Sequence, residues 1–111
     1  AGGHLGFSRA QLDARIRACL PYWEGKTGLH PASVQIKNMK TRWGTCNTAA
    51  KRIWLNLQLV KQPPVCLDYV LAHELTHLLH PDHGNGFWAF LLSVMPDCKA
   101  IRKALNETPF L

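Results

Sequence analysis

His73-Glu74-Leu75-Thr76-His77 is the stretch that decides the fold of this chain. On a helix, histidines at positions i and i+4 lie on one face, so both rings can reach a single metal ion. Glu74 stands beside the first histidine, where its carboxylate can act as a general base toward water. The pattern predicts a helix with Glu74 as the catalytic residue and His73 and His77 as metal ligands. Two core histidines beside a paired glutamate are the structural alternative.

The flanking residues predict that this helix is buried. Apolar side chains follow one another at helical spacing from Val65 to Leu79, and Pro81 forbids continuation. We therefore predict a helix over residues 65–80. A helix that is apolar on most faces lies inside a domain, and buried histidines need partners there, which a metal ion supplies.

A catalytic zinc usually has three protein ligands and one open position, so a third ligand is expected. His83 is the first candidate, because Pro81 ends the helix and Gly84 and Gly86 let the chain fold back toward the metal. The interval before His83 is also that of the third ligand in the metzincin signature. The remaining candidates are His80, Asp97 and Glu107.

The rest of the chain predicts an N-terminal helix, two strands and two further helices. Ser8 can cap the first helix, which is expected to end near Pro21. Strand patterns cover residues 34–37 and 53–59 with a turn at Asn47 to Ala50, so we predict an antiparallel hairpin. Apolar residues within 87–95 and 100–105 predict the C-terminal helices. This order indicates an α+β fold with a small antiparallel sheet packed on the helix of the motif.

Length and composition indicate one domain. A chain of 111 residues, 47% hydrophobic and 18% charged, can bury a single core and is not expected to be disordered. We expect the glycine-rich residues 1–7 to be a tail or tag remnant and residues 8–111 to be the domain. No apolar run approaches a membrane span, so no membrane contact is expected. Cys19, Cys46, Cys66 and Cys98 are scattered and no signal peptide is visible, which indicates reduced thiols and a cytoplasmic location.

Positive charge is concentrated between Gly25 and Leu67. This stretch has seven lysines and arginines and no acidic residue, in a chain whose net charge is +6. A basic hairpin with interleaved tryptophans can attract phosphate groups, so a nucleotide or nucleic acid is a candidate partner. A solvated face over core tryptophans is the alternative. The candidate anion or substrate contacts are Lys40, Arg42, Trp43, Lys51 and Arg52.

Four blocks of the sequence carry a family resemblance: Thr41-Arg42-Trp43-Gly44-Thr45-Cys46, Leu55-Asn56, the run from Tyr69 to Leu78, and His83-Gly84-Asn85-Gly86-Phe87-Trp88. In order and spacing, across residues 12–105, they resemble the YgjP-like zinc metallopeptidase family, a relative of the SprT-like and WLM-type metalloproteases. The resemblance implies a minimal zincin-like domain. It further implies that His73, His77 and His83 bind one Zn²⁺ per chain and that Glu74 is the catalytic base.

The leading hypothesis is a zinc-dependent hydrolase that cleaves a peptide or protein substrate, which would pair as an extended strand with the sheet near the metal. One alternative is a metal-dependent nucleoside triphosphate phosphohydrolase, which the resemblance permits. Another is a nucleic-acid-associated module with a structural zinc. A structural site normally closes its fourth position with a protein ligand and has no use for Glu74, which disfavours this last alternative.

Overall fold

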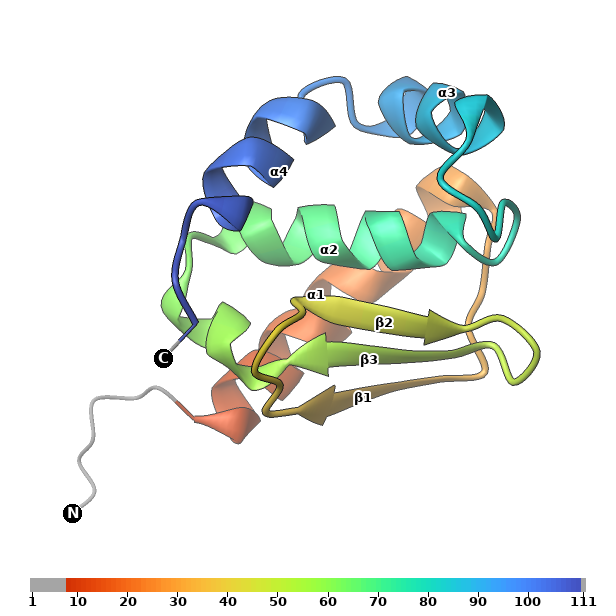
Figure 1. Ribbon diagram of the computed structural model, residues 1–111. Coiled ribbons are helices and arrows are strands. Elements are labelled where there is room, and N and C mark those ends of the chain that lie inside the picture. The colour runs from red at the N-terminus through yellow and green to blue at the C-terminus, as the bar shows by residue number, and fades with distance from the viewer. Residues whose placement is uncertain (1–7, 111) are drawn as a thin grey trace, which may run out of the picture.

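Helix α2 (Pro64–Thr76), which contains the motif residues from His73 to Thr76, lies at the centre of the molecule (Figure 1). The structure, a computed structural model, describes residues 8–110. Helix α2 packs against α1 (Arg9–Thr27), α3 (Asn85–Val94), α4 (Cys98–Asn106) and a small sheet. Its apolar side chains are buried on most faces, as the sequence predicts, because other elements surround the helix. Every other element is therefore positioned by its contact with α2 or by its place in the sheet.

Helix α1 begins where the sequence predicts but ends later. Ser8 caps it through a capping box, in which the Ser8 hydroxyl accepts from the Gln11 backbone (3.2 Å) and the Gln11 side chain accepts from the Ser8 backbone (3.3 Å). The predicted end near Pro21 is wrong, because the helix continues to Thr27. Pro21 is exposed and removes one backbone hydrogen bond, whereas Trp23 beyond it is buried and donates to Asp68 of α2 (2.8 Å). The tertiary contacts of Trp23 outweigh the local loss.

The sheet is mixed, not antiparallel as predicted. Strands β1 (Ser33–Lys37), β2 (Gly44–Asn47) and β3 (Arg52–Asn56) are ordered β1-β3-β2. Strand β1 runs parallel to β3, while β2 and β3 form the antiparallel hairpin around the predicted turn. The prediction missed β2. Because β2 lies between β1 and β3 along the sequence, β3 runs parallel to β1 instead of antiparallel to it. The α+β class itself is confirmed.

Asn56 explains why β3 is shorter than the predicted strand over residues 53–59. Its side chain is fully buried and donates to the carbonyls of Met39 (2.9 Å) and Arg42 (2.7 Å). It also accepts from the backbone N–H of Gln58 (3.0 Å), which caps the 3₁₀ helix η1 (Leu57–Lys61). The strand therefore ends at Asn56, and the alternation of apolar residues continues into a helix turn.

The C-terminal helices are close to the predicted ones, although α3 and α4 each begin two residues earlier than expected. All four cysteines are free. Among the described helices, none is long and apolar enough to cross a membrane. The cytoplasmic location stays a prediction, and the predicted tail at residues 1–7 lies outside the described residues.

Candidate metal centre and catalytic cleft

Three histidine side chains meet at the end of α2. His73 lies in the last turns of α2, His77 is its C-terminal cap residue, and His83 belongs to the segment between α2 and α3. Nε2 of His83 lies 3.0 Å from Nε2 of His77 and 3.2 Å from Nε2 of His73. One ligand atom from each of the three residues lies within 4.8 Å of the others. Among the described residues, this is the group of side chains arranged to hold a metal ion.

The chain brings His83 back because α2 ends four residues before the predicted end at His80. After Thr76 the backbone tightens, with the N–H groups of His77, Leu78 and Leu79 bonded three residues back at 2.9–3.2 Å. Later, Gly86 passes so close to the His80 ring that a Cβ at Gly86 would lie 2.9 Å from it. The segment that carries His83 therefore packs closely against the end of the helix.

His80 supports the cluster through its backbone. The His80 carbonyl lies 3.1 Å from Nδ1 of His77. A carbonyl oxygen can only accept, so Nδ1 of neutral His77 carries the proton and Nε2 keeps its lone pair for a metal. His80, Asp97 and Glu107, the other candidates for a third ligand, do not belong to the cluster that the described residues form.

The donor set fits a zinc ion. Ligands of a tetrahedral zinc, about 2.0 to 2.1 Å from the metal, lie about 3.3 Å from one another. The two nitrogen–nitrogen distances of 3.0 and 3.2 Å are close to that spacing. Burial, together with the neighbouring rings of His77 and His73, lowers the pKa of His83 below its ordinary value. The neutral ring, which is the form that binds a metal, is therefore favoured.

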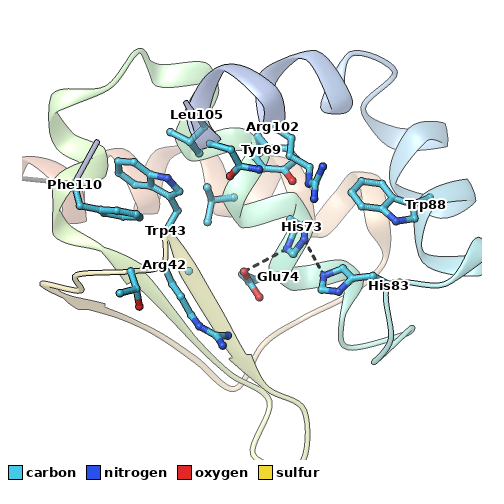
Figure 2. Close-up of a pocket in the computed structure, with 14 residues that line it drawn as sticks. Arg42, Trp43, Tyr69, His73, Glu74, His83, Trp88, Arg102, Leu105 and Phe110 are labelled. Carbon is cyan, nitrogen blue, oxygen red and sulfur yellow. Dashed lines mark hydrogen bonds and ion pairs between the residues drawn. The ribbon is translucent and has the colours of Figure 1, made fainter. Parts of the chain in front are cut away.

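Glu74 is buried beside the cluster. It lies on α2, and its Oε2 is 3.3 Å from Nδ1 of His73 (Figure 2). Both Glu74 and His73 line a cavity of about 590 Å³ between the start of β2, α2 and the C-terminal helices. The carboxylate therefore faces the space next to the three imidazoles, as general-base chemistry requires.

Gly44 lets β2 approach Glu74. A Cβ at Gly44 would lie 2.6 Å from Cγ1 of Val70, 3.1 Å from Oε2 of Glu74 and 3.2 Å from its Cγ. We expect Gly44→Ala to lower the free energy of unfolding by about 1 to 3 kcal/mol, because the methyl group overpacks this contact. Urea denaturation measures the change.

Gly25→Ala is the matched control for this substitution. Gly25 lies inside α1, and a methyl group there would have nothing within 4 Å, so alanine should raise the unfolding free energy by about 0.5 to 1 kcal/mol. Equal effects of the two substitutions would contradict a specific role for the close approach at Gly44.

The basic candidates do not share one face. Arg42 and Trp43 line the cavity with Glu74, and Trp43 stacks on Phe110 with ring centroids 4.4 Å apart. Arg52 lines a smaller pocket beside Trp54 in the sheet. Lys40 and Lys51 are exposed in the loops before β2 and after it. The structure thus brings two of the five candidates, Arg42 and Trp43, to the cavity beside the metal cluster.

Trp54 is already paired with cations of its own chain. Nζ of Lys37 lies 3.9 Å from the centroid of the indole ring, and Cζ of Arg52 lies 5.4 Å from it. Its Nε1 donates to Gln35 (3.2 Å). A nucleobase would have to displace these cations in order to stack, so the predicted nucleic-acid contact gains no support from this ring.

Several cavity residues were not identified as site residues from the sequence. Tyr69 stands one helical turn before His73, so its position in the motif helix was a usable signal. Trp88 and Arg102 also line the cavity, but they depend on how α3 and α4 pack on α2. Cys46 is not a candidate nucleophile, because burial and the nearby Glu74 carboxylate raise the pKa of its thiol to about 11.

Comparisons with known proteins agree with this geometry. The metallopeptidase zymogen of Pyrococcus abyssi, abylysin, is similar in structure with a TM-score of 0.73 and 22% identity, over 81% of this chain and 90% of that one. The metallopeptidase zymogen of Methanocaldococcus jannaschii, jannalysin, gives 0.70 and 22% identity, over 82% of this chain and 87% of that one. At this identity the likeness confirms a shared fold, the expected zincin-like one. No curated protein sequence matches significantly.

The sequence itself carries the family assignment. The family model of the YgjP-like metallopeptidase domain matches residues 5–108, which is nearly the whole chain and includes the three histidines, Glu74 and all of the cavity residues except Phe110. The protein therefore belongs to the YgjP-like family and is a metallopeptidase.

Proposed function

We propose that His73, His77 and His83 bind one Zn²⁺ per chain and that Glu74 is the general base in peptide hydrolysis. The observation that carries the proposal is the convergence of three imidazole Nε2 atoms beside the buried carboxylate of Glu74. This carboxylate faces the cavity that His73 and His83 also line. In this proposal residues 8–111 act as a single catalytic domain.

The chemistry divides between the metal and the chain. A bound zinc ion would lower the pKa of a water molecule and polarise the peptide carbonyl. Glu74 accepts a proton from the attacking water and delivers it to the leaving amide nitrogen. The bond from Nδ1 of His77 to the His80 carbonyl holds that ring in the tautomer that presents Nε2.

The free edge of β2 is the proposed binding site for an extended peptide. The N–H of Asn56 donates to the Trp43 carbonyl (2.9 Å), so alternate residues Trp43, Thr45 and Asn47 bond to β3. The backbone groups of Gly44 and Cys46 therefore point away from β3, along an edge that no described strand covers. Because Gly44 also lines the cavity, a peptide paired with this edge passes the metal cluster.

A substrate screen with and without metal tests the proposal. We expect zinc-loaded protein to cleave peptides, a chelator to abolish cleavage, and added zinc to restore it. Nucleoside triphosphates are assayed in parallel, because phosphohydrolysis is the alternative function. Metal-dependent hydrolysis of nucleotides without cleavage of any peptide would contradict the peptidase proposal, and cleavage that survives complete metal removal would contradict the zinc mechanism.

A further inference from the structure

Two arginines lie on opposite walls of the catalytic cavity. Arg42 precedes β2 and Arg102 projects from α4, and both line the same cavity. Figure 2 shows Arg102 on one side of His73 and Arg42 on the other side of Glu74, over the sheet. Glu74 is the acidic residue that lines this cavity in the described part of the chain, and the proposed mechanism uses it as the base. The cleft is therefore positively charged on both walls.

Neither arginine forms an ion pair with a described residue. In residues 8–110, the ion pairs join Arg17 to Asp13, His30 to Glu24 and His73 to Glu74, and none includes Arg42 or Arg102. Both side chains are exposed, so their guanidinium groups can meet a ligand. A guanidinium group offers paired N–H donors that match the two oxygens of a carboxylate.

Arg102 is held at the cavity by Trp88. Its Cζ lies 5.4 Å from the centroid of the Trp88 ring, and Nζ of Lys99, three residues earlier on α4, lies 5.5 Å from the same ring. That ring is 6.4 Å from the ring of His73 and 6.3 Å from that of His83. A cation–π contact with this ring favours the position of the guanidinium group next to the metal cluster.

We propose that the cleft selects peptides that carry an aspartate or glutamate side chain close to the scissile bond, with Arg102 and Arg42 as the specificity-determining residues. The inference rests on the proposed peptidase function. An acidic side chain would compensate two unpaired cations, whereas a lysine or arginine in the same place would face like charge.

Matched peptides test the proposal. Each peptide is acetylated and amidated, so that a single glutamate is its only carboxylate, and its partner has glutamine at that position. We expect kcat/KM to be about tenfold higher for the best glutamate peptide than for its glutamine partner, from a charge-assisted hydrogen bond at an exposed site. High salt should reduce this ratio.

Substitutions test the contribution of each arginine. Arg102→Gln and Arg42→Gln should each lower the glutamate-to-glutamine ratio of kcat/KM, and the double substitution should bring it close to one. Arg102→Lys should keep part of the preference, and Arg102→Glu should shift it toward a lysine peptide. Lys103→Gln is the matched control, since it removes the same charge from the neighbouring, exposed position of α4 that does not line the cavity. Circular dichroism of each variant confirms that it is folded.

The possible outcomes separate this inference from the proposed function. Equal cleavage of the glutamate and glutamine peptides would overturn the specificity while leaving the peptidase intact. An additional peptide without acidic side chains but with a free C-terminus is included, and a preference for that peptide alone would also overturn the proposal in favour of terminal carboxylate recognition. Cleavage of no peptide at all would overturn the proposed function and this inference with it.

Discussion

Glu74→Gln is expected to lower turnover of a cleavable peptide about 10²- to 10⁴-fold, the usual contribution of a general base. Glutamine has nearly the same shape but cannot take a proton from water. Its amide can still occupy the space between His73 and Gly44, so the fold and the bound metal should be retained. Steady-state kinetics, metal content and thermal denaturation measure the three effects separately.

Glu107→Gln is the control for this substitution, because it makes the same chemical change at an exposed carboxylate just after α4. It should leave turnover close to that of the parent. Undiminished turnover in Glu74→Gln would defeat the proposed mechanism, and loss of zinc in that variant would show that Glu74 instead supports or binds the metal.

His83→Ala and His80→Ala should differ sharply in metal affinity. Loss of His83 removes one of three ligand atoms, so zinc binding should weaken by more than the roughly 10- to 100-fold that follows loss of a group which only orients a ligand. In His80→Ala the ring is lost but the backbone carbonyl that accepts from His77 remains. This variant should therefore bind about one zinc ion per chain, like the parent.

Elemental analysis and competition with a chromophoric chelator measure the zinc content and affinity of both variants. The assignment of the third ligand would be wrong if His83→Ala bound zinc as tightly as the parent while His80→Ala did not. Activity of the same preparations then shows whether cleavage follows metal content.

Local rules made the centre of the site predictable. The spacing of His73 and His77 depends only on helical periodicity. Pro81, which ends a helix, and the flexible glycines around His83 indicated that the chain turns back and brings His83 toward the other two histidines. The cap at Ser8 likewise depends on neighbouring residues, Ser8 and Gln11. In each case the structure follows from interactions between residues a few positions apart.

Tertiary contacts decided what the sequence pattern could not. In the strand pattern over residues 53–59, Asn56 alternates with apolar residues like an outward-facing side chain, but its buried hydrogen bonds to Met39 and Arg42 end the strand. Strand β2 has no clear alternation, and its glycine, unfavourable in a strand, is required by the approach to α2. The place of Arg102 beside the metal cluster depends on the docking of α4, about which residues near Arg102 carry no information.

The order of the strands also bears on how the protein behaves at high concentration. Strands β1 and β2 are both edge strands, and exposed edges can recruit strands of other molecules. Here β1 ends in Lys37, and the guanidinium group of Arg9 occupies its Ile36 carbonyl (2.6 Å). Strand β2 has only four residues, so it offers a second sheet little length for pairing. The molecule can thus keep one edge open to a short peptide while resisting edge-to-edge aggregation.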